Sequence, residues 1–392
     1  MKNTSKNTTR YVLLGVVVVL IVAAIIYLQS LRPQQAPAGN LDNNISILSN
    51  NPSGSPDLGN TANENYPKAP ELAGIAGWIN TKPLTLQSLH GKVVLIDFWA
   101  YSCVNCLRTL PYLNSWNAKY KDSGLVIIGI HTPEFNFEKD YNNVLMATKK
   151  YNITYPVAQD NDYMTWTAFQ NQYWPREYLI DKNGYIRYDH IGEGNYDETE
   201  AHIQQLLSEL GNNMTSQGLV NITDQTPTTY NTQELYVGYN FAHPRGQNVG
   251  NPEGLIIYKT INYTMPKNSA DSAVDLSSIK QDTIYVEGPW TSDPDNLATA
   301  TNDASSIYLS FIAENANIVA SSNISTQVEV LIDGKDIDSD VAGSDVIVSG
   351  GKSFMKVDEP RLYDIYRGPY GRHVLQLVIM QQGFSFNSFT FG

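Results

Sequence analysis

The sequence predicts an α/β domain followed by an all-β domain, both behind one apolar N-terminal segment. Residues 67–211 alternate apolar runs with segments of helical periodicity, which indicates a mixed sheet covered by helices on both faces. Residues 230–392 contain short alternating segments separated by Asp, Gly, Asn and Pro, typical of an antiparallel, jelly-roll-like β-sandwich. The formal net charge of −13 over 392 residues argues against a nucleic-acid partner.

The N-terminus predicts a single membrane span. Residues 11–31 are uncharged and almost wholly apolar, and this length is sufficient to cross a bilayer. Lys2, Lys6 and Arg10 precede the run. The positive-inside rule therefore makes residues 1–10 a cytoplasmic tail and places the remainder on the extracytoplasmic side of the cytoplasmic membrane.

A cleaved signal peptide is the alternative to this anchor. Residues 36–38 (Ala-Pro-Ala) resemble a small-residue cleavage site. The apolar run, however, exceeds the ~7–15 apolar residues of a signal peptide and ends well before that site. We therefore expect an uncleaved anchor. Residues 32–66 are rich in Asn, Pro, Ser and Gly and predict a flexible linker.

Periodicity and turn residues predict the elements of the α/β domain one by one. A hairpin signal, Asp-Lys-Asn-Gly at 181–184, separates its last two strands, and Gly211 caps its last helix. In chain order we expect a strand at 92–99, helix at 103–121, strand at 124–131, helix at 138–151, strands at 155–158, 177–180 and 185–188, and a helix through 203–210.

Residues 212–229 are rich in Thr, Asn and Gln and predict a linker between the domains. The β domain beyond it shows no convincing amphipathic helix. Its strands are expected at 254–259, 283–287, 306–313, 327–332, 346–349, 361–366, 373–380 and 384–391.

Cys103 and Cys106 are the only cysteines, and they form a Cys-x-x-Cys pair between a predicted strand and a predicted helix. Such a dithiol can gain and lose two electrons without a metal or an organic cofactor, and we expect neither. Half a zinc site is the alternative, but a structural zinc site needs four ligands and no second cysteine pair exists. In an exported chain, a disulfide of this pair would be a working one.

The position of Cys103 predicts its role. Unpaired N–H groups and the positive end of the dipole at a helix N-terminus favour a thiolate, so Cys103 is expected to be the exposed nucleophile. Cys106, one turn further and facing inward, is expected to resolve the mixed disulfide.

Residues 94–100, followed after two residues by Cys-x-x-Cys, closely resemble the active-site strand of the thioredoxin superfamily, and Pro111 matches the proline in its active-site helix. The resemblance implies a thioredoxin fold for residues 67–211. It also implies that Asp97 exchanges a proton with Cys106, a task that a raised carboxyl pKa would suit. The alternative for Asp97 is a strand-end acid paired to a lysine.

Pro175 matches the cis-proline that faces the dithiol in this family. A cis bond would present the backbone of Trp174 to an extended substrate. Trp174, Tyr101, Val104 and Asn105 are expected to line the substrate groove. For Trp174 and Tyr101, simple packing is the alternative. Trp174 replaces the usual small or β-branched residue, and Val104-Asn105 replaces the usual Gly-Pro, so these positions bear on substrate and redox potential.

His131 and Glu134 follow the second strand of the α/β domain and should lie near the dithiol. Two interpretations are open for them: a pair that caps the loop, or a part in proton transfer.

The resemblance extends to the membrane-anchored TlpA/ResA-like thioredoxins, and most closely to the soluble part of DipZ proteins. The segments that carry it are 78–92, 98–111, 129–135 and 156–162. Segments 236–239, 331–334, 361–363 and 386–392 resemble the carbohydrate-binding-like module of DipZ proteins.

This resemblance implies a thiol–disulfide reductase of exported proteins, with apo-cytochrome c among the candidate clients. DipZ proteins carry a multi-helix membrane domain that delivers electrons, whereas one span is predicted here. A separate CcdA-like or DsbD-like membrane donor would therefore have to supply electrons.

Two other function classes remain as alternatives. A peroxiredoxin-like peroxidase would need a Pro-x-x-x-Thr-x-x-Cys motif, which the sequence lacks. A cell-wall or glycan-binding protein with an accessory thioredoxin domain would stack sugars on exposed aromatic residues, although such residues more often fill the core of a sandwich. The aromatic residues in question include Tyr285, Trp290, Tyr308, Tyr363 and Tyr366.

Overall fold

The computed structural model describes residues 66–214, 217–268 and 273–392. The predicted cytoplasmic tail (1–10), the predicted anchor (11–31) and the predicted linker as far as residue 65 lie outside these ranges. Within the described ranges, no helix combines the length and the apolar character that a bilayer crossing requires.

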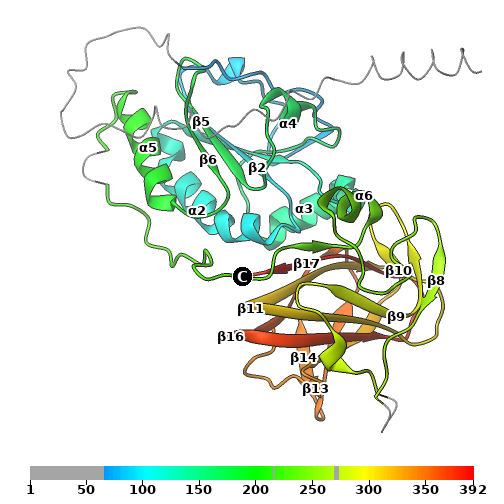
Figure 1. Cartoon of the computed structure of the whole chain (residues 1–392). Helices are drawn as coiled ribbons and strands as arrows, with labels where there is room; N and C mark the ends of the chain where they lie inside the picture. The colour runs from blue at the N-terminus through cyan, green and yellow to red at the C-terminus, as the bar shows by residue number, and fades with distance from the viewer. Residues whose placement is uncertain (1–65, 215–216, 269–272) are drawn as a thin grey trace, which may run out of the picture. The chain divides into compact units, whose positions relative to one another are not determined.

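The first domain is built on a six-stranded mixed sheet (Figure 1). Its central strand β2 (Val93–Trp99) pairs in parallel with β3 (Leu125–His131) and antiparallel with β5 (Arg176–Ile180). Every residue of β2 is buried, as expected for a central strand whose residues are all apolar except Asp97. The order is β1-β4-β3-β2-β5-β6, with β1 at Gly77–Ile79, β4 at Val157–Gln159 and β6 at Ile186–Ile191.

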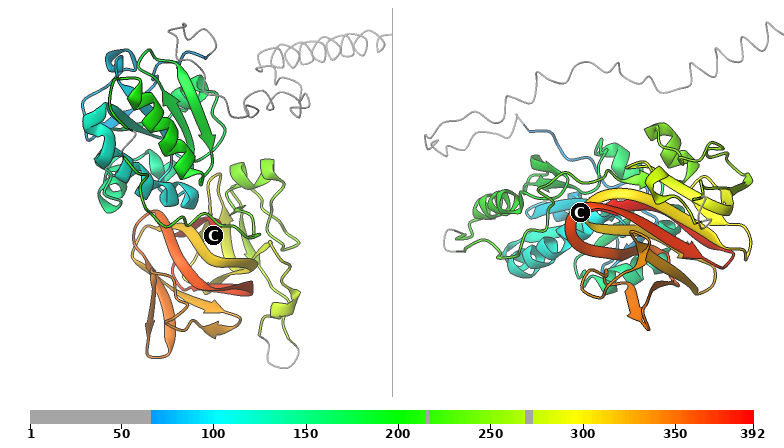
Figure 2. Two further views of the ribbon diagram at one scale, coloured as in Figure 1. Left: turned by 90° about the vertical axis from the view of Figure 1, so that its left-hand side faces the viewer. Right: turned by 60° about the horizontal axis from the view of Figure 1, so that its bottom comes forward.

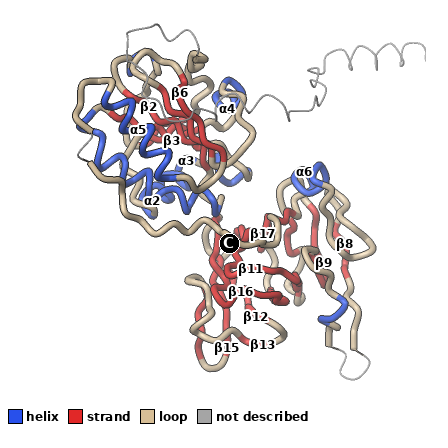
Figure 3. The backbone as a smooth tube through the Cα atoms, turned by 60° about the vertical axis from the view of Figure 1, so that its left-hand side comes forward, coloured by secondary structure: helices blue, strands red, loops and turns tan. Residues whose placement is uncertain are grey.

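Helices cover both faces of this sheet, as Figure 3 shows. Leu95 and Trp99 of β2 share one core with three helices, whereas Ile96 and Phe98 share the opposite core with a short helix and a 3-10 turn. Successive strand residues point to opposite faces, so the odd-numbered residues of β2 face the three helices. These are α2 (Val104–Tyr120), α3 (Tyr141–Lys150) and α5 (Tyr196–Ser208), while α4 (Met164–Ala168) and η2 (Gln87–Leu89) lie on the other face.

The sequence does not predict β1 or α4, because elements of three and five residues are too short to show a period. The helix expected at 138–151 begins later, at Tyr141. A 3-10 turn, η4 (Asn136–Lys139), precedes it, and the Asp140 side chain caps α3 by accepting a hydrogen bond from the backbone N–H of Asn142.

The C-terminal domain is an antiparallel β domain whose eleven described strands join one hydrogen-bonded sheet (Figure 2, yellow-green to red). Alternate residues of its strands meet in one large core. The strands are β7 (Leu235–Tyr236), β8 (Thr260–Tyr263), β9 (Ile284–Ser292), β10 (Leu297–Thr299), β11 (Ser305–Ser322), β12 (Thr326–Ile332), β13 (Lys335–Asp336), β14 (Val346–Ser349), β15 (Lys352–Val357), β16 (Arg361–Ile379) and β17 (Phe384–Phe391).

Two long strands, β11 and β16, join the strands of this domain into one continuous hydrogen-bonded network around its core. β11 pairs with β9 through residues 306–309 and with β17 through residues 316–322, so it connects these two strands within the domain. Its pairing with β16 is interrupted by register shifts between Ala313 and Asn317, which let a long strand bend. The strands expected separately at 361–366 and 373–380 are both parts of β16, and the strand expected at 254–259 is wrong, since turns precede β8 there.

The predicted linker 212–229 packs against the first domain where the structure describes it. The backbone N–H of Val220 donates to Glu200 of α5 over 2.8 Å, and the Tyr112 hydroxyl of α2 donates to the carbonyl of Ile222 over 3.2 Å. Val220 and Ile222 also join the core beneath α2. This segment is therefore fixed along α2 and α5.

The two domains touch beside the first turn of α2. Phe135 of the first domain shares an apolar cluster with Tyr236, Val319 and Leu362 of the second. The backbone N–H of Asn136 also donates to the Asp295 carboxylate over 2.9 Å. Apolar packing and hydrogen bonds thus both hold the contact.

Candidate active site

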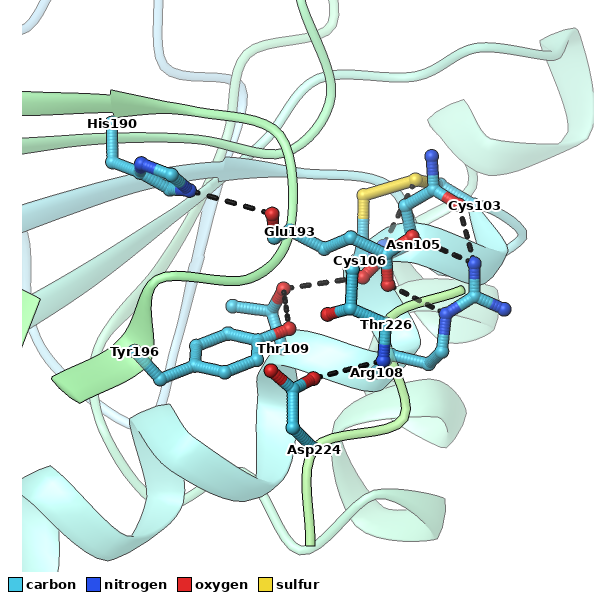
Figure 4. A network of polar contacts seen from close by, with 10 residues as sticks. All are labelled: Cys103, Asn105, Cys106, Arg108, Thr109, His190, Glu193, Tyr196, Asp224 and Thr226. Carbon is cyan, nitrogen blue, oxygen red and sulfur yellow. Dashed lines mark hydrogen bonds and ion pairs between the residues drawn. A yellow bond between two sulfur atoms is a disulfide. The ribbon is translucent and has the colours of Figure 1, made fainter. Parts of the chain in front are cut away.

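Cys103 and Cys106 form a disulfide at the N-terminus of α2 (Figure 4). Cys103 is the N-cap residue, and the backbone N–H of Cys106 donates to its Sγ atom over 3.2 Å. Cys103 is 8% exposed and Cys106 is fully buried, so Cys103 is less open than the sequence suggested. In the reduced pair, this N–H and the helix dipole favour a thiolate on Cys103.

Asp97 lies in β2 on the face that carries α2, in line with Leu95 and Trp99. It is 1% exposed, and neither carboxyl oxygen has a hydrogen-bond partner among the described residues. Burial raises the pKa of Asp97 to about 8. No described lysine pairs with this acid, so the alternative of a lysine ion pair is wrong.

Glu177 is an acid of the site that the sequence reasoning missed. It lies in β5 directly opposite Asp97 in the β2–β5 register and is 2% exposed. Burial raises the pKa of Glu177 to about 8, and the neighbouring Asp97 charge adds to this effect. Its position two residues after Pro175, with the parity of the inward-facing Leu179, was the signal available in the sequence.

The Trp174–Pro175 peptide bond is cis, in the form that the sequence predicts. The Trp174 indole N–H donates to the carbonyl of Thr132 over 3.1 Å. Its ring also lies against Trp166, with ring centroids 4.2 Å apart. Trp174 is therefore held in place by a hydrogen bond and by packing.

A pocket of about 650 Å³ opens at Cys103, and residues of both domains line it. Trp174, Val104 and Asn105 lie in its wall, as predicted for the substrate groove. The C-terminal domain contributes the other wall, which could not be predicted from the sequence. Its residues there include Thr232, Glu234, Tyr236, Arg245 and Phe391.

Tyr101 does not line this pocket, contrary to the expectation. Its side chain is buried and stacks on His131, with ring centroids 5.6 Å apart. His131 is itself fully buried, and neither of its ring nitrogens has a hydrogen-bond partner among the described residues. Burial lowers the pKa of His131 to about 3, so its ring is neutral near pH 7 and packs rather than transfers protons.

Glu134 accepts a hydrogen bond from the hydroxyl of Tyr236 in the C-terminal domain. Burial raises the pKa of Glu134, and the bond from Tyr236 opposes that effect. Glu134 therefore joins the domains beside the pocket and does not form a capping pair with His131.

The residue that caps the loop is Glu138, which the sequence reasoning did not single out. Its carboxylate accepts hydrogen bonds from the backbone N–H groups of Ser102, Glu134 and Phe135, and from the Ser102 hydroxyl. Burial, with the Glu134 charge, raises the pKa of Glu138 to about 7. Glu138 thus ties the turn before Cys103 to the loop after β3.

Arg108 joins the first turn of α2 to the loop between β6 and α5 (Figure 4). Its guanidinium donates to both carboxylate oxygens of Glu193, over 2.6 and 2.8 Å, and to the Asn105 side-chain carbonyl over 2.8 Å. In the same loop, the N–H of Gly192 donates to the carbonyl of Pro175 over 2.9 Å. These bonds position the dithiol helix against the cis-proline loop.

The strand order, with a dithiol at the start of α2, defines a thioredoxin-fold domain. Within the described ranges, His, Cys, Asp and Glu form no group of three or more that could hold a metal ion. Comparison with known proteins agrees with the fold: residues 68–207 match the Redoxin family, and residues 232–392 match the family described as thioredoxin-like C-terminal domain.

Two relatives and one solved structure illustrate the similarity. Protein DipZ of Mycobacterium bovis is 39% identical over 280 residues, which are 70% of this chain and 38% of DipZ. The thiol-disulfide oxidoreductase YkuV of Bacillus subtilis is 31% identical over 36% of this chain and 94% of its own length. The solution structure of a thioredoxin-like protein in the oxidized form is 31% identical, covers 37% of this chain and 97% of its own, and has a TM-score of 0.35.

The chain belongs to the thioredoxin-like thiol–disulfide oxidoreductases of the TlpA, ResA and DipZ type. It spans well under half of the length of the DipZ proteins that it matches.

Proposed function

We propose that the chain is a membrane-tethered, extracytoplasmic reductase of disulfides in exported proteins. The observation that carries this proposal is the Cys103–Cys106 pair at the N-terminus of α2, with Cys103 alone reaching the pocket and Asp97 buried on the α2 face of the sheet. That arrangement provides a thiolate for attack, a second thiol for release and a carboxyl that can take the second thiol's proton.

The reaction balances with the dithiol as the only electron source. The Cys103 thiolate attacks the substrate disulfide, forms a mixed disulfide and releases one substrate thiolate. Cys106 gives its proton to Asp97 and attacks Cys103 Sγ, which releases the second substrate thiolate. Two electrons reach the substrate, and the enzyme is left with the disulfide seen in the structure.

The tether and the electron donor rest on the N-terminal sequence. The apolar run 11–31 with its preceding basic residues supports a single span with the N-terminus inside. A CcdA-like or DsbD-like membrane protein would then return two electrons to the pair. Exported proteins with reducible disulfides, apo-cytochrome c among them, are the proposed clients.

For the C-terminal domain we favour a part in the substrate cleft over glycan binding. Thr232, Tyr236 and Phe391 supply one wall of the pocket at Cys103, so this domain would select which disulfides reach the thiolate. The aromatic residues considered for sugar stacking are all buried and offer no flat exposed surface: Tyr285, Trp290, Tyr308, Tyr363 and Tyr366.

Trapping of clients by a Cys106→Ser variant tests the proposal. Without the resolving thiol, the mixed disulfide on Cys103 should accumulate, and exported proteins should be recovered by non-reducing electrophoresis and identified by mass spectrometry. The Cys103→Ser variant is the matched control and should trap nothing. Equal adducts on both variants, or none on either, would contradict a Cys103-initiated reductase.

A further inference from the structure

We propose that Glu177 is a second proton carrier of this site, which receives the Cys106 proton from Asp97 and passes it through Thr199 and Tyr188 to the surface beside α5. This inference rests on the function proposed above. It adds a residue and an exit route that lie away from the substrate pocket.

The proposed relay begins at two buried carboxyls that lie side by side on neighbouring strands. Asp97 and Glu177 are direct cross-strand partners in β2 and β5, and such partners point to the same face with Cβ atoms about 4.5–5.5 Å apart. That face carries the core in which Cys106, Leu95 and Leu179 pack. Both carboxyls therefore lie in the layer between the sheet and the dithiol helix.

Several buried polar atoms around this carboxyl pair lack hydrogen-bond partners among the described residues. Both oxygens of Asp97, one oxygen of Glu177 and the hydroxyl of Tyr155 are buried without a hydrogen bond to any described residue. Gly129 lies next to Asp97 in β3, and a Cβ there would be 2.9 Å from Trp99 Nε1 and 3.3 Å from the Tyr155 ring. Buried groups of this kind are costly, and a proton-transfer role explains why they are kept.

The Asp97 and Glu177 carboxylates would repel each other electrostatically. Two carboxyls this close and this buried resist being ionised together, so the pair titrates as a unit, and its singly protonated form, with the proton on Glu177, can accept a proton at Asp97. A proton that reaches Asp97 can therefore be exchanged against one already held by Glu177. Tyr155 is the other titratable group facing the pair, and burial raises its pKa well above its usual value, so it stays neutral.

Thr199 and Tyr188 provide a route for the proton from Glu177 to solvent. The Thr199 hydroxyl of α5 lies close enough to the Glu177 carboxyl to lower its pKa, and it is 3.3 Å from the Tyr188 hydroxyl of β6. Tyr188 is half-buried, stacks on His202 with ring centroids 4.2 Å apart, and lines a small surface hollow of about 70 Å³ with it. None of the residues of this hollow belongs to the pocket at Cys103.

The relay conserves protons. With Asp97 ionised and Glu177 protonated, Cys106 gives its thiol proton to Asp97 as it attacks Cys103 Sγ. The Glu177 proton leaves through Thr199 and Tyr188 to solvent, and the Asp97 proton then moves to Glu177, so the pair returns to its starting state and no further electron carrier is required. Reduction of the disulfide reverses each transfer.

The test is a pH profile of the resolving step in the full chain. Reduced protein is mixed with excess disulfide peptide in a stopped-flow instrument between pH 5 and 9, in the wild type and in the Glu177→Gln, Thr199→Val and Asp97→Asn variants. Glu198→Gln, an exposed change on the same helix as Thr199, is the matched control. Formation of the mixed disulfide is measured separately for each variant in the Cys106→Ser background.

We expect Glu177→Gln to slow resolution about tenfold near pH 7 and to move its pH profile, and Asp97→Asn to slow it about a hundredfold. Thr199→Val should slow resolution without moving the profile. In the Cys106→Ser background all variants should form the mixed disulfide at the wild-type rate.

Two results would overturn the relay while leaving the reductase intact: a Glu177→Gln profile that superimposes on Glu198→Gln while Asp97→Asn is slow, or an equal slowing in the Cys106→Ser background. A wild-type protein that resolves no disulfide at any pH would remove the proposed function and the relay together.

Discussion

Tyr236 of the C-terminal domain donates a hydrogen bond to the buried carboxyl of Glu134, which lies beside the pocket at Cys103. The Arg245 guanidinium covers the Tyr236 ring, 4.5 Å from its centroid. A catalytic pocket and a domain contact thus share the same residues. The C-terminal domain is therefore part of the active-site architecture.

Tyr236→Phe is expected to lower the free energy of unfolding by about 1–3 kcal/mol, because it leaves the buried Glu134 carboxyl without its donor. The interface should also open more often, so limited proteolysis between the domains should accelerate. Urea unfolding and a protease time course measure both effects. Tyr370→Phe, which removes an exposed hydroxyl, is the control; equal behaviour of the two variants would show that the Glu134 bond does not hold the interface.

Arg108→Lys is expected to cost about 1–3 kcal/mol of stability, because an ammonium group cannot make the two parallel hydrogen bonds to Glu193. The reduction potential should change as well, since the first turn of α2 loses its link to the cis-proline loop. Equilibration with glutathione buffers and thermal unfolding give the two values.

Arg367→Lys is the matched control for that substitution, because Arg367 is itself 64% exposed and pairs with Asp364 within the other domain. It should leave both quantities almost unchanged. If the two variants kept the same potential as the wild type, Arg108 would not position the dithiol.

Trp174→Ala is expected to slow reduction of a protein disulfide about tenfold while leaving a small disulfide such as 2-hydroxyethyl disulfide little affected. The reason is that Trp174 forms a wall of the pocket along which an extended substrate would lie, whereas a small disulfide needs only to reach Cys103. The rate of the Trp174→Phe variant should fall between those of the wild type and Trp174→Ala, since it keeps an apolar wall but loses the hydrogen bond to Thr132. Equal slowing with both substrates would instead assign Trp174 to the stability of the loop.

Stability should fall as pH rises from 6.5 to 8.5. Asp97 and Glu177 have pKa values raised by burial to about 8, against 3.8 and 4.5 as ordinary values. The folded state therefore keeps protons that the unfolded chain has released, so the contribution is complete below pH 4 and is lost as pH passes through 8. His131 acts in the opposite direction, but most of its effect falls below its ordinary pKa of 6.5, so it changes stability little across this window.

Guanidinium unfolding at steps of pH measures this slope. The Asp97→Asn/Glu177→Gln double variant should have a flatter profile, and Glu198→Gln should follow the wild type. A wild-type curve that is level or rising over this range would mean that the two carboxyls are ionised in the folded protein.

The sequence was sufficient for the local features of the site, because strand, helix and motif lie close together in the chain. Cys103, Cys106, Asp97 and Pro175 fall at the places expected from their neighbours, and continuous apolar runs marked β2 and β3. Short elements such as β1 escaped because three residues show no period.

What the sequence could not supply was the pairing of distant segments. Glu177 gains its importance only from its register opposite Asp97, 80 residues earlier in the numbering. The Glu134–Tyr236 contact joins residues 102 positions apart. Tyr101 was misplaced because a residue near a motif need not face the pocket: its ring turns inward onto His131.

The reduction potential of the Cys103–Cys106 pair, measured against glutathione and paired with thiol trapping in cells, tests the central claim most directly. A reductase should have a potential near that of thioredoxin, about −270 mV, and a pair that is mostly reduced at steady state. A potential near that of DsbA, about −120 mV, with the pair found oxidised in cells, would contradict the account and make the protein an oxidant.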